Sequence, residues 1–250
     1  MGITVDFFLY FIHINLIFPF IFIEISYLTK NKKYVKIKQK IKKEYKMLSA
    51  KEKLMKKISS NAPLKQKGTE LTRNLSVSKL LDTMEITKSH IYFWTDKTPF
   101  SNFFYNPFNY KGYNLKFSEQ GFMLEKALLF ANKSNNFNKE AIEKILKASS
   151  PNQAKYAGRE VKGYIDSEWD KVRYSKMVEV LKEKFNNLLL KETLLSTGER
   201  TLVEASPYDK IWGVGLSEKD PLIFNESNWK GKNLLGKALM EVRDFYKKEK

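Results

Sequence analysis

The stretch EASPYDKIWGVG, residues 204–215, combines two carboxylates, a Ser-Pro turn, one tryptophan and two glycines. A strand that only fills a core needs none of these residue types. Gly213 and Gly215 let the backbone adopt positive φ or approach a neighbour closely, and the Trp212 indole offers a flat face on which a nucleobase can stack. The stretch therefore predicts a ligand-binding loop that follows a short strand at residues 201–205.

The carboxylates of Glu204 and Asp209 suit the cleavage of an N-glycosidic bond. That bond breaks at the anomeric carbon of ribose through a state that resembles an oxocarbenium ion. One carboxylate can stabilise the positive charge or deprotonate the attacking water, while a second group helps the base to leave. A simpler interpretation also exists for this loop, because Asp209 can merely form the turn and Trp212 can merely anchor a core.

Two earlier segments carry further candidates. In the helix that begins at Ser118, Glu119 and Lys126 lie two turns apart on one face, about 10 Å along the axis, so both can look into one cavity. In PFSNFF, residues 99–104, Asn102 lies among aromatic side chains and can hydrogen-bond a ligand while the rings stack on it. The simpler alternatives are a favourable helix-dipole position for Glu119, a solvated Lys126 and a turn at Asn102.

The composition argues against several classes of enzyme. The chain of 250 residues has no cysteine, which excludes disulfides and thiolate chemistry. Its two histidines, His13 and His90, lie in no motif that would support a zinc site or a Ser-His-Asp hydrolase. We therefore predict a reaction that uses neither a metal nor a cofactor.

The amino-terminal residues are mostly apolar. Residues 7–28 are long enough to cross a bilayer, and lysines follow from Lys30, as is typical of a cytoplasmic flank. Two interpretations of residues 1–29 remain open. In the first, they are a membrane anchor that leaves the catalytic domain in the cytoplasm. In the second, they lie upstream of a true start at Met47 or Met55.

The formal net charge of +17 is unevenly distributed. Residues 30–57 contain 13 lysines against two glutamates, a net of +11, whereas residues 1–29 carry −2 and the remaining 193 residues carry +8. We interpret residues 30–88 as a lysine-rich helix followed by a linker. Nucleic-acid binding through this segment would depend steeply on salt, but the mild charge elsewhere does not favour it as the main function.

Residues 89–250 read as a single folded domain. The pattern predicts a strand at 91–94, a hairpin over 108–117 that turns at Lys111-Gly112, and several helices. The predicted helix starts and stops are Ser118, Ser150, Ser167 and Asn233 as starts, and Gly158 and Gly198 as stops. This arrangement predicts a mainly helical α+β domain with a small sheet of short strands.

Several motifs occur in one order along this domain: FSNFF, FSEQGFMLEKAL, NQAKYAGREVK, W…VRYSKMVEVLKEKF, LLSTGERTLVEASPYDKIWGVGL and WKGKNLLGKALMEVR. Together they resemble the NADAR, or YbiA-like, family over residues 91–246. The pairing of SEQ…K with LVEAS..D..WG.G is distinctive. The resemblance implies a YbiA-like fold and N-glycosidase activity, on riboflavin-pathway intermediates or on ADP-ribosyl groups attached to nucleobases.

The resemblance also implies which residues form the site. It places Asn102, Glu119, Lys126, Arg159, Lys184, Glu204, Asp209, Trp212 and Gly213 in the pocket. We assign catalytic roles to Glu119, Asp209 and Lys126 and substrate binding to the other six. In this hypothesis Glu119 and Asp209 face the ribose, and Lys126 and Arg159 bind phosphate oxygens. Lys126 has a second possible role as an amine that forms a Schiff base. Asn233 is interpreted as a helix cap rather than as part of the pocket.

One departure from the family pattern concerns the first helix of the site. Many relatives have SEHYFQAQK where this chain has SEQGFMLEK, so that Gln120 and Gly121 replace histidine and tyrosine. We interpret the exchange as a sign that this chain contacts a different edge of its substrate than those relatives do. The alternative to an enzyme is a non-catalytic module that binds ADP-ribose or a nucleotide. The expected partner in either case is a ribosyl or ADP-ribosyl compound, with ADP-ribosylated nucleic acid as a further candidate.

Overall fold

The computed structural model describes residues 76–131 and 138–249. The predicted apolar segment at 1–29 and most of the predicted helix and linker at 30–88 lie outside these ranges, as does the predicted membrane contact through residues 7–28. Within the described ranges, no helix is both long and apolar enough to span a bilayer.

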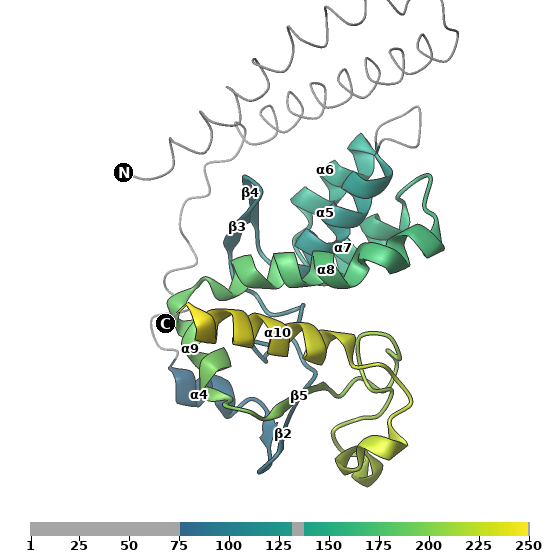
Figure 1. Cartoon of the computed structure of the whole chain (residues 1–250). Helices are drawn as coiled ribbons and strands as arrows, with labels where there is room; N and C mark the ends of the chain where they lie inside the picture. Colours follow the sequence, from purple (N-terminus) through teal and green to yellow (C-terminus); the bar gives the residue numbers. More distant parts are fainter. Residues whose placement is uncertain (1–75, 132–137, 250) are drawn as a thin grey trace, which may run out of the picture. The chain divides into compact units, whose positions relative to one another are not determined.

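The described chain contains seven α-helices and five short strands (Figure 1). The helices are α4 (Val77–Leu81), α5 (Ser118–Phe130), α6 (Lys139–Lys147), α7 (Pro151–Arg159), α8 (Asp166–Phe185), α9 (Leu188–Ser196) and α10 (Leu234–Lys248). The strands are β1 (Glu85–Ile86), β2 (His90–Phe93), β3 (Phe108–Tyr110), β4 (Tyr113–Leu115) and β5 (Thr201–Glu204), and two short 3-10 turns follow, η1 (Pro221–Phe224) and η2 (Glu226–Asn228). The predicted mainly helical α+β fold is confirmed.

β2 is the centre of a three-stranded sheet with the order β1-β2-β5. It pairs antiparallel with β1 and parallel with β5, where Phe93 lies opposite Glu204. Because β2 and β5 run in the same direction, the chain leaves both strands at one edge of the sheet, and this edge positions the site described below. β1 lies upstream of residue 89, so the ordered fold includes residues that the sequence suggested were linker.

The predicted hairpin forms from β3 and β4, which pair antiparallel. Lys111 and Gly112 both have positive φ, +52° and +83°, which is the backbone that a two-residue hairpin turn needs to match the twist of its strands. The predicted turn is therefore confirmed, and the predicted strands at 91–94 and 201–205 agree with β2 and β5 to within one residue.

Two helix boundaries follow from local chemistry. Ser150 precedes α7 and its side chain accepts a hydrogen bond from the Gln153 backbone N–H, with Pro151 in the first turn. Gly198 follows α9 with φ of +63°, a conformation that costs glycine little. Both predictions are confirmed.

Two other boundaries differ from prediction. α8 begins one residue before Ser167, and Ile165 occupies the cap position without a side-chain bond. α7 does not stop at Gly158 but continues to Arg159. A Cβ at Gly158 would lie 2.1 Å from Sδ of Met123 on α5, so this glycine serves the close approach of two helices rather than a helix end.

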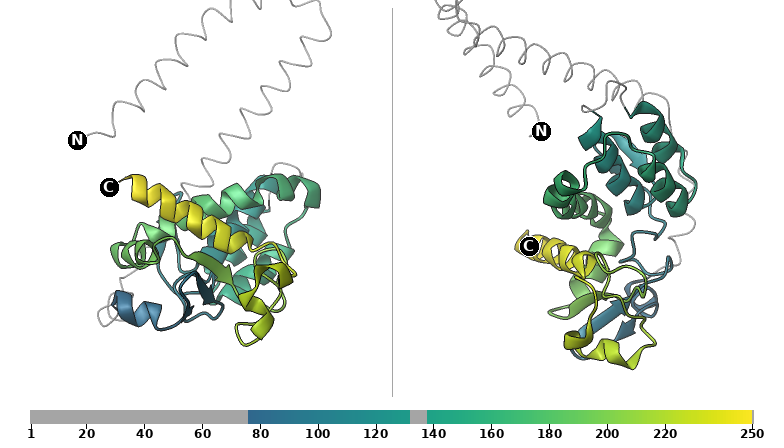
Figure 2. Two further views of the ribbon diagram at one scale, coloured as in Figure 1. Left: turned by 60° about the horizontal axis from the view of Figure 1, so that its bottom comes forward. Right: turned by 90° about the vertical axis from the view of Figure 1, so that its right-hand side faces the viewer.

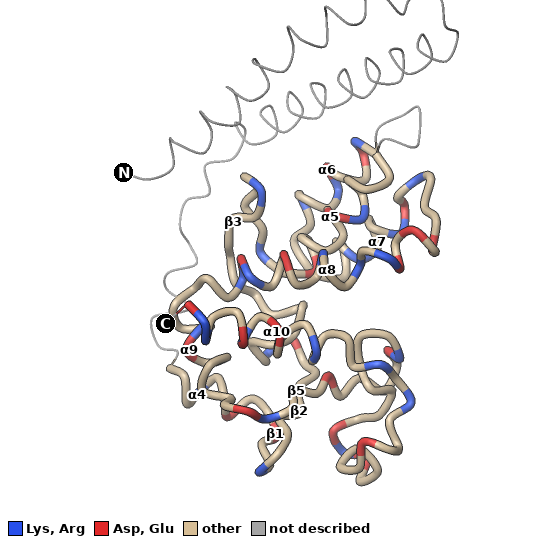
Figure 3. Tube along the Cα trace, in the orientation of Figure 1, with Lys and Arg blue, Asp and Glu red and all other residues tan. Residues whose placement is uncertain are grey.

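The helices form two groups around α8. α5 packs against α6, α7 and α8, while α10 lies along α8 and covers β5, and the views of Figures 1 and 2 agree on this arrangement. Buried side chains of the sheet, including Tyr92 and Val203, pack against Val214, Leu216 and Ile223 from the loop after β5. Basic and acidic residues are interspersed along the described elements (Figure 3), so the charge of this part does not gather on one helix.

Asn233 occupies the N-cap position of α10 with a left-handed backbone, φ +52°. The predicted helix start at Asn233 is therefore confirmed, although its side chain makes no cap hydrogen bond. Instead, Asn233 Oδ1 accepts from the Glu204 backbone N–H at 3.0 Å, and Nδ2 donates to the Leu202 carbonyl at 2.8 Å. The amide satisfies two backbone groups on the edge of β5 that would otherwise lack strand partners.

Close contact between α10 and β5 generates the first prediction. A Cβ at Gly236 would lie 2.0 Å from the Leu202 carbonyl oxygen, and backbone cannot move aside as a flexible side chain can. Replacing glycine by alanine within a helix is normally stabilising. Because of the close contact here, we instead expect Gly236→Ala to lower the free energy of unfolding by about 2 kcal/mol or more. Urea denaturation measures this effect. The neighbouring exposed change Lys237→Ala is the control, and equal stability of the two variants would contradict the close packing.

Candidate active site

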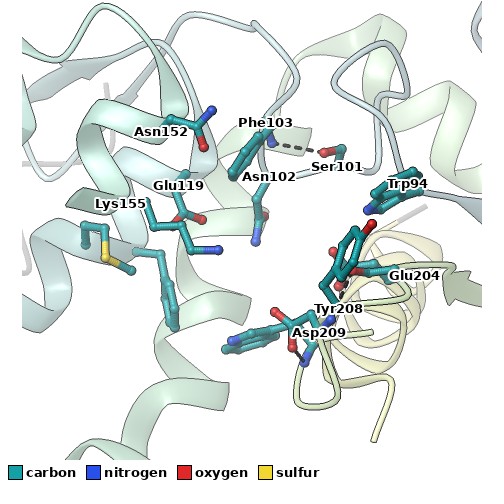
Figure 4. Close-up of a pocket in the computed structure, with 14 residues that line it drawn as sticks. Trp94, Ser101, Asn102, Phe103, Glu119, Asn152, Lys155, Glu204, Tyr208 and Asp209 are labelled. Atoms are coloured by element: carbon teal, nitrogen blue, oxygen red, sulfur yellow. Dashed lines mark hydrogen bonds between the residues drawn. The ribbon is translucent and has the colours of Figure 1, made fainter. Parts of the chain in front are cut away.

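A cleft of about 420 Å³ opens where the edge of the sheet meets α5 and α7 (Figure 4). The loop after β2, the first two turns of α5 and α7, the end of β5 and the loop that follows β5 all contribute to it. Its lining consists of Trp94, Ser101, Asn102, Phe103, Glu119, Phe122, Met123, Asn152, Lys155, Glu204, Ser206, Tyr208, Asp209 and Trp212. A volume of this size is within the range of small-molecule sites.

Glu119 enters the cleft from the first turn of α5 and is only 6% exposed. Its backbone N–H donates to the Asn102 carbonyl at 3.1 Å, and Ser118 Oγ donates to the Asn102 side chain at 2.9 Å, which fastens the loop after β2 to the helix start. Burial raises the pKa of Glu119 to about 7; the nearby Lys155 ammonium opposes this shift and the Asp209 carboxylate adds to it.

Glu204 ends β5 with its backbone held on both sides. Its N–H donates to Asn233 Oδ1, and its carbonyl accepts from the Val214 N–H at 3.0 Å. Burial, followed by the negative charges of Asp209 and Glu119, raises the pKa of Glu204 to about 8. Its Oε2 is buried and has no hydrogen-bond partner among the described residues, which is costly unless a ligand supplies one.

Asp209 is oriented by its own loop. Its Oδ1 accepts from the backbone N–H groups of Ile211 and Trp212, both at 2.8 Å, so Oδ2 is the oxygen that can face a ligand. The Trp212 ring lies edge-to-face with Phe122, with centroids 5.0 Å apart. A Cβ at Gly213 would lie 2.9 Å from the carbonyl oxygens of Asp209 and Glu204, so glycine makes this tight loop possible without lining the cleft itself.

The structure brings together the predicted residues Asn102, Glu119, Glu204, Asp209 and Trp212 around one cleft. This convergence of the Glu119 and Asp209 carboxylates from segments 90 positions apart is the feature on which the predicted chemistry depends. Asn102 points its amide into the cleft (Figure 4).

Lys126 and Arg159, by contrast, are not among the described residues that line the cleft. Lys126 Nζ lies 4.1 Å from the centre of the Tyr164 ring, and the Arg159 guanidinium lies 5.1 Å from that of Tyr156. Burial and the Arg159 charge lower the pKa of Lys126. Lys126 shares a helix face with Glu119 but lies two helical turns further along α5. Its side chain is therefore beyond the cleft, near the start of α8.

Lys184, predicted to bind substrate, is fully buried beneath the cleft. Its Nζ donates to the Ser101 carbonyl at 2.7 Å, and burial lowers its pKa to about 7. Because Ser101 and Asn102 line the cleft and Lys184 does not, the lysine supports the loop instead of touching a ligand.

Lys155 is the one lysine or arginine among the described residues of the cleft, and it was not predicted from the sequence. It points inward beside Glu119 (Figure 4). Asn152 and Lys155 are three positions apart in a capped helix, which places them on one face, and this spacing was the available signal. Trp94 and Tyr208 were also missed, since single aromatic residues after a strand and in a turn carry no distinctive pattern.

Gln120 and Gly121 do not line the cleft, so the interpretation of this exchange as a new substrate edge is not supported. Gln120 is fully buried; its Oε1 accepts from the Lys116 N–H at 2.7 Å and its Nε2 donates to the Ile145 carbonyl at 3.0 Å. A Cβ at Gly121 would lie 2.8 Å from a methyl group of Val180. Both residues serve the packing of α5 against its neighbours.

No cluster of three or more histidine, aspartate or glutamate side chains suited to a metal ion occurs in the part of the chain that the structure describes. The fold and cleft together define a small α+β protein whose site is built from carboxylates, one lysine and aromatic rings. The chain belongs to the NADAR family: the NADAR domain matches residues 92–246. The predicted family resemblance is thereby confirmed.

Known proteins extend the comparison. The N-glycosidase R617 of Acanthamoeba polyphaga mimivirus is 41% identical over 128 residues, which cover 51% of this chain and 72% of that protein. Protein irg-1 of Caenorhabditis elegans is 34% identical over 184 residues, 67% of this chain and 84% of the relative. The NMR structure of the E. coli protein YbiA aligns with a TM-score of 0.54 and 28% identity, covering 70% of this chain and 95% of YbiA.

Buried Lys184 generates the second prediction. Its folded pKa of about 7 is below the ordinary lysine value, so between pH 7 and about 10 the unfolded state binds the extra proton. The stability of the wild type should therefore rise with pH across this window relative to Lys184→Met, by at most about 1.4 kcal/mol per pH unit. Below pH 7 the difference should be flat.

Urea unfolding of both proteins at pH 6, 7, 8 and 9 measures the difference. Lys171→Met, an exposed change on the same helix, should show no such slope against the wild type. A pH-independent difference between Lys184→Met and the wild type would mean that the buried amine keeps its proton throughout.

Proposed function

We propose that the cleft hydrolyses an N-glycosyl bond between a ribosyl group and a base. The observation that carries this proposal is the convergence of Glu119, Glu204 and Asp209 with Lys155 beside the Trp212 indole. Carboxylates of this kind suit a reaction that develops positive charge on a sugar. The name of the viral relative, an N-glycosidase, supports the same reaction class.

Two carboxylates act at the anomeric carbon. Asp209, with Oδ1 held by two backbone N–H groups, presents Oδ2 to the developing positive charge and needs little reorganisation to do so. Glu119, whose pKa is raised to about 7 by burial, is matched to accept a proton from water near neutral pH. The water oxygen bonds to the anomeric carbon as its proton passes to Glu119.

Glu204 acts on the other side of the bond as the acid. Its pKa of about 8 keeps the carboxyl group protonated at neutral pH, and its unpartnered Oε2 is free to interact with the leaving nitrogen. As the C–N bond breaks, its electron pair goes to nitrogen and the Glu204 proton follows. Solvent exchange then returns a proton to Glu204 and removes the one on Glu119.

Lys155 supplies the positive charge of the site. It offsets part of the repulsion among the carboxylates, since its ammonium lowers the pKa of Glu119 and Glu204 against the effect of burial. Because Lys155 lines the cleft and Lys126 and Arg159 do not, we assign to Lys155 the binding of phosphate oxygens that was predicted for Lys126 and Arg159. Because Lys126 contacts Tyr164 away from the cleft, no step is assigned to its amine.

The substrate classes to test are riboflavin-pathway intermediates, free ADP-ribosyl nucleobases and ADP-ribosylated nucleic acid. The full chain is incubated with each, and mass spectrometry detects the released base or ribose phosphate. A non-catalytic binding module is the competing function, and it predicts retention of ligand without release of base. That result with every class would overturn the proposal.

The third prediction concerns the two carboxylates at the sugar. Glu119→Gln and Asp209→Asn preserve shape and the loop hydrogen bonds, so we expect intact folds and a fall in kcat of at least about 100-fold. Initial rates of base release measure it. Glu125→Gln is the matched control, a buried carboxylate on the same helix that contacts Tyr110 and Lys111 instead of the cleft. A variant within a few-fold of the wild type would remove that residue from the chemistry.

The fourth prediction separates acid catalysis by Glu204 from substrate binding. A purine leaving group needs a proton, whereas the pyridine of a ribosylpyridinium departs neutral without one. Glu204→Gln should slow release of the purine by about 100-fold or more and leave release of pyridine within a few-fold. The wild-type rate on purine substrates should fall above pH 8, as the acid ionises. Equal losses on both substrates would exclude the role of proton donor.

A further inference from the structure

Two aromatic side chains form one end of the cleft and take no part in the mechanism above. Trp94 directly follows β2 and is 38% exposed, and Tyr208 lies in the loop after β5 and is 87% exposed. Their ring centroids are 6.3 Å apart at an interplanar angle of 50°. Both rings line the cleft, and Figure 4 shows them side by side next to Glu204.

Packing within the domain does not account for this pair. Some tyrosines of the fold belong to the core, for example Tyr92 at 1% and Tyr110 at 2% exposed, and Tyr208 is more exposed than the other exposed tyrosines of the described residues. Tyr208 instead keeps most of its surface in water, on a loop whose neighbouring Asp209 is fixed by backbone hydrogen bonds. An exposed ring on a fixed loop at a cleft has apolar area available for a ligand.

The strand pairing and the loop sequence also place Trp94 and Tyr208 close to the carboxylates of the proposed mechanism. Phe93 pairs in register with Glu204, so Trp94 is one residue beyond the partner of the proposed acid, and Tyr208 precedes Asp209. A second aromatic wall, Trp212 with Phe122, lies elsewhere in the lining. The carboxylates are thus flanked by two separate aromatic surfaces within one cleft.

We propose that Trp94 and Tyr208 form a stacking subsite for a second nucleobase of the substrate, distinct from the base that stacks on Trp212. The proposal rests on the proposed function, since it takes the ribosyl group between the two surfaces to be the one that reacts. Aromatic side chains stack on the face of any base. The subsite therefore recognises a planar base and does not distinguish one base from another. Rotation of the exposed Tyr208 ring, a fast motion for a surface side chain, opens the pair to admit it.

Binding is tested first, without reference to catalysis. The full chain labelled with ¹⁵N in its indoles is titrated with adenosine monophosphate, a probe that carries one base, and Trp94→Ala identifies the Trp94 resonance. We expect that resonance to shift on binding, and Tyr208→Ala to weaken the titration of this resonance by about ten-fold. Tyr105→Ala is the control, an exposed tyrosine packed on Phe117 outside the cleft lining.

Catalysis then separates this inference from the proposed function. Two substrates share one scissile bond, and only one of them carries a second base. Trp94→Ala and Tyr208→Ala should raise KM for the two-base substrate by about ten-fold and leave the one-base substrate unchanged. The second base is supplied either within a dinucleotide or as the neighbouring base of an oligonucleotide, which distinguishes the two sources.

Each outcome decides one question. Absence of base release from any substrate by the wild type would overturn the proposed function, yet the indole titration would still report on the subsite. An active enzyme whose Trp94 resonance does not move, or whose variants raise KM equally for both substrates, would overturn the stacking subsite alone.

Discussion

The amide of Asn233 is the contact on which the site depends. It pairs with the Glu204 N–H and the Leu202 carbonyl, and so joins the start of α10 to the edge of β5. The residue tolerates the left-handed backbone that this requires, as asparagine does more readily than most residues. Gly236, one turn later, lets the helix approach the strand. These two residues hold the end of β5 in place and therefore determine where the Glu204 carboxyl group lies.

The same end of β5 concentrates negative charge at low solvent access. Glu119, Glu204 and Asp209 would repel one another strongly if all were ionised, and burial adds to this cost. The raised pKa values of Glu119 and Glu204, together with the Lys155 ammonium, relieve it. Carboxyl groups with different affinities for protons in one cleft provide an acid and a base near neutral pH, which is the condition that acid–base catalysis needs.

Buried polar side chains that do not line the cleft hold its loops and helices in place. Lys184 holds the Ser101 carbonyl from below, and Gln120 joins the strand side of the hairpin to the end of α6. Lys184 lies in a motif that resembles the family pattern, and Gln120 lies where this chain departs from that pattern. From residue type alone, both would be mistaken for residues that contact the ligand. Their burial shows that they position the loops and helices that do contact a ligand.

The sequence by itself determined the α+β class, the hairpin turn at Lys111-Gly112, the start of α7 and the stop after α9, because turns and caps depend on residues a few positions apart. Its motifs also identified the family and five of the residues that line the cleft. Only the tertiary structure decided that Lys155 rather than Lys126 faces the carboxylates, that Lys184 is buried, that Asn233 binds a strand and that Trp94 meets Tyr208. Those outcomes depend on how far one helix extends past another and on which segments meet at a sheet edge. Spacing along the chain does not contain that information, since the same helical periodicity is compatible with several packings.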